Sequence, residues 1–443
     1  MLKACMKRVD ISPPKGLCLM GFPHYPRHNT GVHDPLYAAC MYLNDGKTEI
    51  AMVTLDLLYF SKRYVNEVRS RVNKECGIDG ANIMISASHT HSGPMAAGST
   101  DPDALYKGDE RPDEYIESIV EKISSLICEA KRDAYDAYFA SGAAVCGAES
   151  GVGGNRRVRG GPHDPMVSVM AIKDTCNEVR GAIVNYALHP TFIHEWSTVC
   201  TADYPCYLKL EMEEKHQKLL VGFAQGTSGN QSSRYYRDGE SYTDAERVGR
   251  ILGRAANSVL EKAEWHSDIT LKTASECMPI ETRSFGTEEE LEKIVAHDKA
   301  VYEELYAKYG KSEKREEYYL WQNANLRHLG SEKQLMFTRL LNSGVRIPML
   351  MDETPTEIQL FDIGGTCVIG LQGELFVEYG LFIKAMVPYG LVIVNELTNG
   401  CHPGYMYTPE SLLTGGYETG NSLLAEDFGK KIVNKVLETV KKL

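Results

Sequence analysis

Long apolar segments and clusters of basic residues are both missing from this chain of 443 residues. No apolar run approaches the roughly 18–20 residues of a membrane-spanning helix, so we predict no membrane span. The formal net charge is −12 and no block of lysine and arginine offsets it, which argues against a nucleic-acid partner. The first residues contain no apolar signal-like stretch, and we therefore expect a cytoplasmic protein.

Paired cysteine motifs are also absent. The 12 cysteines are scattered, no Cys-x-x-Cys pair occurs, and the spacing of Cys200 and Cys206 fits no common metal motif. We expect reduced, mostly buried thiols. The remaining composition, with 43% hydrophobic and 24% charged residues, is that of an ordinary globular protein.

One order of elements occurs twice in the chain: strand, turn, strand, helix, strand. The first copy is predicted at 37–43, 50–55, 61–76 and 83–88, and the second at 357–363, 366–371, 374–386 and 391–397. We therefore predict an α/β fold in which two pseudo-repeated mixed β-sheets pack in the centre with helices outside, in αββα-like layers. We expect one domain over 1–443, with a charged helical insertion at about 287–341.

Histidines follow two of the predicted strands. The stretch 81–94, ANIMISASHTHSGP, is an apolar strand that ends in His89 and His91. If the chain is still extended there, residues two apart point to the same face, so both imidazoles enter one space. A second strand, 181–188, ends at His189. The His-x-His spacing alone is equally consistent with two hydrogen-bonded histidines on a loop.

Acidic residues follow strands as well. Asp56 comes directly after the strand 50–55, where we interpret it as the N-cap of the helix 61–76 in preference to a site residue. Glu374 has the equivalent position in the second half, and the segment 398–405 is the counterpart of the His89–His91 segment. Two imidazoles, one carboxylate and an open position are typical of a catalytic zinc site, with a further histidine to carry protons.

Two loops are candidates for function. The glycine-rich segment 151–165 carries Arg156 and Arg157, whose fixed donor geometry suits an anion or a developing oxyanion, although a solvated loop explains the composition equally well. The polar segment 95–112 has the length of a lid. Asp203 either orients a ligand histidine or caps a helix.

Several motifs in order resemble the neutral/alkaline non-lysosomal ceramidase family, in a short form made of the catalytic domain alone. They are SASHTHSGP, the NRR after the glycine loop, ALHPT, FAQGTSGNQSS, LQGE and the GYMYTPE…GGYE segment. The match runs from about residue 8 to residue 425.

The resemblance implies a zinc-dependent amidohydrolase. It implies a Zn²⁺ site formed by His89, His189, Glu374 and Tyr405. It also implies that His91 carries protons, and that Tyr417 and Arg156, with Arg157 as the fallback, face the oxyanion.

Two departures from the family bear on the substrate. The family's Ser-Pro-Asn is here Ser232-Ser233-Arg234, so Ser232 is either a residue near the scissile amide or a polar loop residue. Family members that cleave ceramide carry a secretion signal and a C-terminal β-sandwich domain, and we see neither here. We expect cleavage of the amide bond of a small-molecule or lipid-like N-acyl compound. The alternatives are an esterase or lactonase with the same zinc site, and a metal- or ligand-binding pseudoenzyme; a homo-oligomer is compatible with all three.

Overall fold

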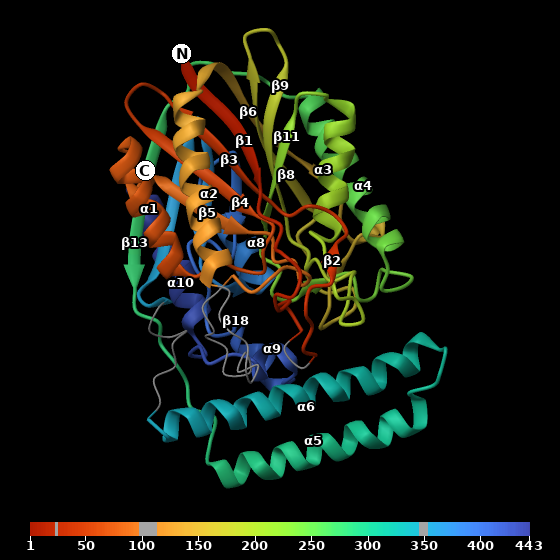
Figure 1. Ribbon diagram of the computed structural model, residues 1–443. Helices are drawn as coiled ribbons and strands as arrows, with labels where there is room; N and C mark the ends of the chain where they lie inside the picture. The colour runs from red at the N-terminus through yellow and green to blue at the C-terminus, as the bar shows by residue number, and fades with distance from the viewer. Residues whose placement is uncertain (23–24, 97–112, 345–352) are drawn as a thin grey trace.

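Two β-sheets pack face to face between outer layers of helices (Figure 1). The computed structural model describes residues 1–22, 25–96, 113–344 and 353–443, so most of the loop expected at 95–112 lies outside the described residues. Apolar side chains from both sheets meet in one core, among them Met41, Phe361 and Ile393. The sheets are therefore held together by buried apolar area, which is the main stabilising contribution to such a sandwich.

The larger sheet has eight strands in the order β11-β9-β8-β6-β1-β3-β4-β5. Their bounds are β1 (Leu2–Asp10), β3 (Tyr37–Asn44), β4 (Glu49–Leu55), β5 (Ile83–Ala87), β6 (Tyr135–Val145), β8 (Met166–Asp174), β9 (Val179–Tyr186) and β11 (Leu220–Gln225). The edge strand β11 also contacts β3, β4 and β5, so the sheet coils strongly. Coiling brings the segment after β9 next to the segment after β5.

The smaller sheet has four strands in the order β13-β14-β15-β17. They are β13 (Leu271–Met278), β14 (Thr356–Ile363), β15 (Thr366–Leu371) and β17 (Leu391–Asn395). Short strands pair outside the two sheets: β2 (Gly31–Val32) with β10 (Val199–Cys200), β7 (Gly154–Asn155) with β12 (Gln231–Ser232), and β16 (Glu374–Leu375) with β18 (Tyr405–Met406). All three short pairs join loops at the sheet ends.

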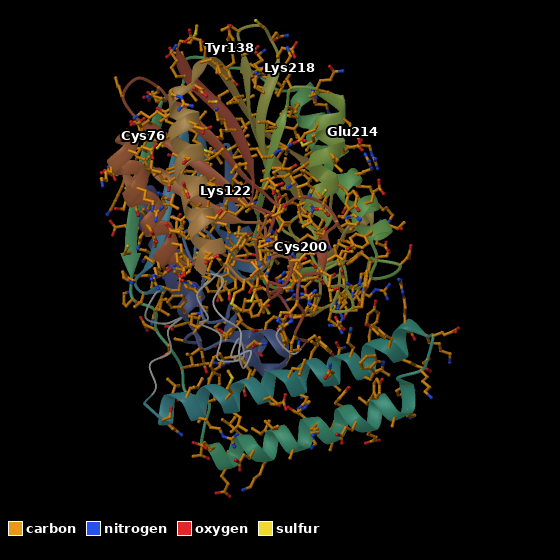
Figure 2. All side chains as sticks on the ribbon, viewed as in Figure 1. Cys76, Lys122, Tyr138, Cys200, Glu214 and Lys218 are labelled. Atoms are coloured by element: carbon orange, nitrogen blue, oxygen red, sulfur yellow. The ribbon has the colours of Figure 1, made fainter. Side chains whose placement is uncertain are left out.

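Helices cover both outer faces of the sandwich. The larger sheet is covered by α1 (Lys62–Cys76), α2 (Asp113–Arg132), α3 (Tyr204–Lys215) and α4 (Tyr242–Glu261), and the smaller by α8 (Val377–Met386) and α10 (Phe428–Val440). Their outer faces are charged: Figure 2 labels Glu214 on the outer side of α3, where it pairs with Arg250 of α4 at 2.9 Å. The predicted αββα layering is confirmed.

The internal repeat is also confirmed. In the first copy β4 pairs antiparallel with β3 and parallel with β5, and in the second β15 pairs antiparallel with β14 and parallel with β17. Two details differ from the prediction. Glu374 precedes α8 and lies in the short strand β16, and the N-cap of α1 is Ser61.

Asp56 therefore does not cap a helix. Its carboxylate accepts from the backbone N–H of Tyr37 at 2.8 Å and forms a buried ion pair with Lys209 of α3 at 2.6 Å. Several residues separate the end of β4 from the start of α1, which leaves the carboxylate at the sheet end, beyond the reach of the helix N–H groups.

The charged insertion is a helical hairpin of α5 (Glu288–Tyr309) and α6 (Arg315–Asn342), which lies across one end of the sandwich (Figure 1). Helix α5 starts with a capping box between Thr287 and Glu290, and most of its side chains project into solvent (Figure 2). Helix α6 packs on α9 (Tyr417–Gly420) so closely that a Cβ on Gly420 would lie 2.5 Å from the Cα of Gly330. The insertion is thus seated over the strand ends.

All 12 cysteines are free thiols. No helix within the described residues combines the length and the apolar content needed to cross a membrane.

Candidate active site

His89 and His91, the two histidines of the His-Thr-His segment, face the same space, although the chain there is not extended. Strand β5 ends at Ala87, and His89 adopts a left-handed backbone conformation with φ of 68°. The premise of an extended chain is therefore wrong, but the rings of His89 and His91 still lie 4.8 Å apart between centroids. Gly21 of the N-terminal loop makes room for this turn, because a Cβ there would lie 2.5 Å from the Cβ of His91.

His189 and Glu374 join them from the other strand ends. The rings of His89 and His189 lie 4.7 Å apart. The Oε2 atom of Glu374 is 3.0 Å from Nε2 of His189 and 3.2 Å from Nε2 of His89. Three side chains from segments far apart in the sequence thus converge on one point.

Backbone carbonyls fix the tautomers of both imidazoles. The Nδ1 atom of His89 lies 2.9 Å from the carbonyl oxygen of Leu58, and Nδ1 of His189 lies 2.8 Å from that of Ser228. Because a carbonyl oxygen only accepts, each Nδ1 carries a proton, and each ring directs its Nε2 towards Glu374.

The donor groups at this point suit a cation. Burial and then the nearby Arg156 lower the pKa of His189 to about 4. Burial would raise the pKa of Glu374, but His89 and His189 lower it well below its usual range, so Glu374 is a carboxylate. Its Oε2 lies 3.0 Å from Nε2 of His189. The spacing matches the ligand–ligand edges, about 3.3 Å, of a tetrahedral zinc site with bonds of about 2.0–2.1 Å. The residues fit a divalent cation.

A second layer of contacts links the two sides of this cluster. Ser228 donates its hydroxyl to Oε1 of Glu396 at 2.5 Å and lies 3.1 Å from Nδ1 of His189. Oε2 of Glu396 accepts from the backbone N–H of Leu375 at 2.8 Å, next to Glu374. Burial and then Glu374 raise the pKa of Glu396 well above its usual range. Sequence reasoning missed Glu396, although it directly follows a strand, β17, at the same end of the sandwich.

His91 differs from the other two histidines. Its Nε2 lies 3.3 Å from Nε2 of His89, while its buried Nδ1 has no hydrogen-bond partner among the described residues. Burial, and then the neighbouring His89 and His189, lower its pKa well below the usual value. No carbonyl fixes its tautomer, so either nitrogen can take up a proton. The ligand nitrogens of the three histidines lie within 4.8 Å of one another, so His91 is also close enough to ligate a metal.

Tyr405 lies beside Glu374 because β16 and β18 pair in register. Its ring is buried under the guanidinium of Arg156, whose Cζ is 5.6 Å from the ring centroid, and is 6.2 Å from the ring of Tyr417. Burial and then the Glu374 carboxylate raise the pKa of Tyr405 well above its usual value.

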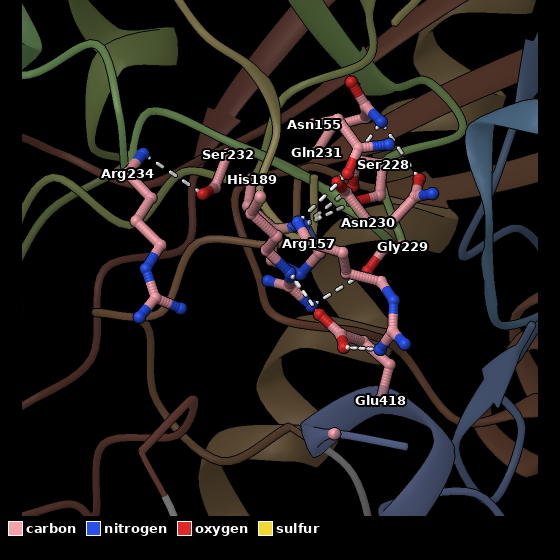
Figure 3. A network of polar contacts seen from close by, with 12 residues as sticks. Asn155, Arg157, His189, Ser228, Gly229, Asn230, Gln231, Ser232, Arg234 and Glu418 are labelled. Carbon is pink, nitrogen blue, oxygen red and sulfur yellow. Dashed lines mark hydrogen bonds and ion pairs between the residues drawn. The ribbon is translucent and has the colours of Figure 1, made fainter. Parts of the chain in front are cut away.

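Arg156 and Arg157 of the glycine-rich loop share one carboxylate, that of Glu418; Figure 3 labels Arg157 and Glu418. Arg156 donates Nε to Oε1 of Glu418 at 2.8 Å, and Arg157 donates Nη1 to Oε2 at 2.6 Å. Nη2 of Arg157 donates to the 411–415 loop, whereas Arg156 lines the cavity beside His91. The geometry therefore favours Arg156 over Arg157 as the group that faces a substrate.

A cavity of about 180 Å³ opens next to the cluster. Its base is formed by His91, Arg156, Ser232, Tyr405 and Tyr417, and its roof by Gln322, Asn325, Leu326 and Leu329 of α6. Ser232 is buried in β12 and accepts from the backbone N–H of Arg234 at 3.2 Å. The base is built from several separate segments of the chain and the roof from the insertion, so the insertion completes the cavity.

Asp203 acts as a helix cap. It accepts from the backbone N–H of Tyr204 at the start of α3, and from the N–H groups of Phe192 and Ile193 at 2.9 Å each. Of the two alternatives, helix capping is what the structure shows, and the same carboxylate anchors the segment that follows His189.

No protein-family model and no curated protein sequence matches the chain. Solved structures do match it, two ceramidases among them. The chain superposes on neutral ceramidase from Pseudomonas aeruginosa with a TM-score of 0.73 and 19% sequence identity, covering 100% of this chain and 75% of that one. It superposes on a ceramidase complexed with C2 with a TM-score of 0.74 and 18% identity, covering 99% and 74%. The protein thus has the fold of neutral ceramidases, as the motifs predict.

Proposed function

We propose that this protein is a zinc-dependent hydrolase that cleaves the carbon–nitrogen bond of an N-acyl compound. The observation that carries the proposal is the convergence of two imidazole nitrogens and a carboxylate oxygen, with N–O distances of 3.0 and 3.2 Å, next to a cavity that His91 and Tyr405 line. The neutral ceramidase fold supports it, since the protein with that name acts on an N-acyl substrate.

His89, His189 and Glu374 would hold the cation, and Tyr405 lies beside Glu374 at the fourth position implied by the motifs. A divalent cation at this point supplies Lewis-acid polarisation of the amide carbonyl and lowers the pKa of a coordinated water. The Ser228–Glu396 contacts orient His189, as outer hydrogen bonds do for metal-binding histidines.

The other side chains at the base of the cavity supply proton transfer and charge stabilisation. His91, with neither nitrogen fixed by a carbonyl, accepts the proton of the attacking water and returns it to the leaving amine. Arg156 and Tyr417 face the developing oxyanion, and Ser232 contacts the amide.

The test is an assay of short N-acyl amides against the purified protein with and without added zinc, with products identified by mass spectrometry. We expect turnover that a chelator abolishes and zinc restores. His91→Ala should abolish it as well, whereas the exposed surface variant His297→Ala, on α5, should not. No turnover of any amide in the zinc-loaded protein would contradict the proposal.

Esters and lactones are assayed in parallel, because the same groups stabilise the oxyanion of an ester. Turnover of esters alone would replace the amidase by an esterase. Zinc binding without any turnover would identify a pseudoenzyme.

A further inference from the structure

Arg234 occupies the position where the chain departs from the Ser-Pro-Asn of the ceramidase motif. It follows β12, and its backbone N–H donates to Ser232 at the base of the cavity, at 3.2 Å. Its side chain lines the same cavity as His91 and Arg156. In Figure 3 this side chain lies apart from Glu418, the carboxylate that binds Arg156 and Arg157.

The guanidinium of Arg234 has no carboxylate within ion-pair distance in the part of the chain that the structure describes. It donates one Nη2 bond to the neutral Asn323 of α6 at 2.8 Å, and its Cζ lies 5.5 Å from the ring centroid of Tyr319. Its Nε is buried and has no hydrogen-bond partner among the described residues. Burial lowers the pKa of Arg234, as expected for a cation that lacks a counter-ion.

The other two arginines that line the cavity have carboxylate partners. Arg156 shares Glu418 with Arg157, at 2.8 and 2.6 Å, and Arg237 binds Glu240 at 2.6 Å. Arg234 is therefore the arginine of the cavity wall that lacks a carboxylate partner within the described residues.

A partly buried guanidinium that lacks a carboxylate partner and has an unused, buried Nε donor suits an anion that arrives with the ligand, because arginine matches the planar geometry of a carboxylate. We propose that Arg234 determines substrate specificity by binding a carboxylate on the N-acyl compound. The substrate would then be an acidic amide, such as an N-acyl amino acid or the monoamide of a dicarboxylic acid, where ceramide has a neutral head. This inference rests on the proposed function.

Binding is measured by calorimetry on the zinc-loaded protein with three sulfonamides that contain no scissile amide. N-(propylsulfonyl)glycine carries the carboxylate on the amine side, 3-(ethylsulfamoyl)propanoate carries it on the acyl side, and N-(propylsulfonyl)ethanolamine is neutral. We expect at least one acid to bind at least tenfold more tightly than the neutral compound, and the stronger acid to identify the side that carries the charge.

Arg234→Gln should reduce this preference to less than threefold by weakening acid binding, with the neutral compound bound as before. Arg234→Lys should restore part of the preference. Arg254→Gln, which removes an exposed arginine of α4, is the matched control and should leave it intact. If Arg234 only anchored α6, Arg234→Gln would weaken the binding of all three ligands equally. That result would overturn the inference.

Equal binding of the acids and the neutral compound to the wild type would also overturn it. Turnover of the matched amides, N-butyrylglycine, N-ethylsuccinamate and N-butyrylethanolamine, is measured separately. If no amide is turned over but the acidic sulfonamides still bind more tightly than the neutral one, the proposed hydrolase is refuted. The role of Arg234 in binding a carboxylate would then still hold.

Discussion

The two halves of the sandwich place an acidic residue at the same point and use it differently. Asp56 follows β4 and Glu374 follows β15, the equivalent strands of the repeated strand–strand–helix–strand unit. Asp56 is buried against Lys209, at 2.6 Å, whereas Glu374 lies within 3.2 Å of two imidazoles. The topology fixes where the carboxylate lies. The residue that packs opposite determines whether the carboxylate forms a structural ion pair or is a candidate metal ligand.

The comparison explains why one carboxylate is structural and the other is a candidate ligand. The Lys209 ammonium pairs with the charge of Asp56, and the backbone N–H of Tyr37 donates to the same carboxylate oxygen. The imidazoles opposite Glu374 direct their Nε2 atoms towards it, since both Nδ1–H groups are held by carbonyl oxygens. Only the second arrangement fits a shared cation, and four substitutions test the difference.

The largest effect is expected for Glu374→Gln. We predict loss of bound metal and a fall in kcat/KM of about 10³-fold or more, because several kcal/mol of charge stabilisation are removed. Metal content by mass spectrometry and amide turnover are measured together. Asp56→Asn is the matched control and should keep its metal, and equal metal loss in both variants would contradict the distinction.

His91→Ala should reduce kcat by about 10²–10⁴-fold, the usual contribution of a positioned proton carrier. Its metal content should stay close to that of the wild type, unlike that of His89→Ala. Substantial metal loss from His91→Ala would instead make His91 a third nitrogen ligand, which its position 3.3 Å from His89 permits.

Asp56→Asn should lower the free energy of unfolding by about 3–5 kcal/mol, because it leaves the Lys209 ammonium buried without its partner. This free energy is measured by denaturant unfolding of the metal-loaded protein. An unchanged midpoint of the denaturation curve would show that the ion pair of Asp56 and Lys209 contributes nothing to stability.

The smallest effect is expected for Ser228→Ala, which removes the contact between His189 and Glu396 while leaving every ligand in place. Metal affinity should fall by about 10–100-fold, as for other outer contacts of metal-binding histidines. Competition with a chromogenic chelator gives the affinity. A loss as complete as that of Glu374→Gln would mean that the contact holds the local fold together.

Much of the fold could be predicted because its signals are local. Alternating and continuous apolar runs, with turns between them, located β3, β4, β14 and β15 and their shared order. The candidate ligands were found because His89, His189 and Glu374 each follow an apolar strand. Their role as metal ligands stays a prediction.

The rest depends on residues that meet only in the folded chain. Lys209 lies 153 residues from Asp56, so nothing near Asp56 distinguishes an ion pair from a helix cap. The partners of Glu396 and the unpaired state of Arg234 likewise depend on loops from several parts of the sequence. Nothing in the local amino-acid sequence around His89 indicates its left-handed backbone conformation.

The most direct measurement is anomalous diffraction from a crystal of the zinc-loaded protein, with data collected on both sides of the zinc absorption edge. We predict one peak at about 2.0–2.2 Å from Nε2 of His89, Nε2 of His189 and a carboxylate oxygen of Glu374. A peak elsewhere in the protein, or none at this point in the presence of zinc, would contradict the shared cation on which the proposed chemistry depends.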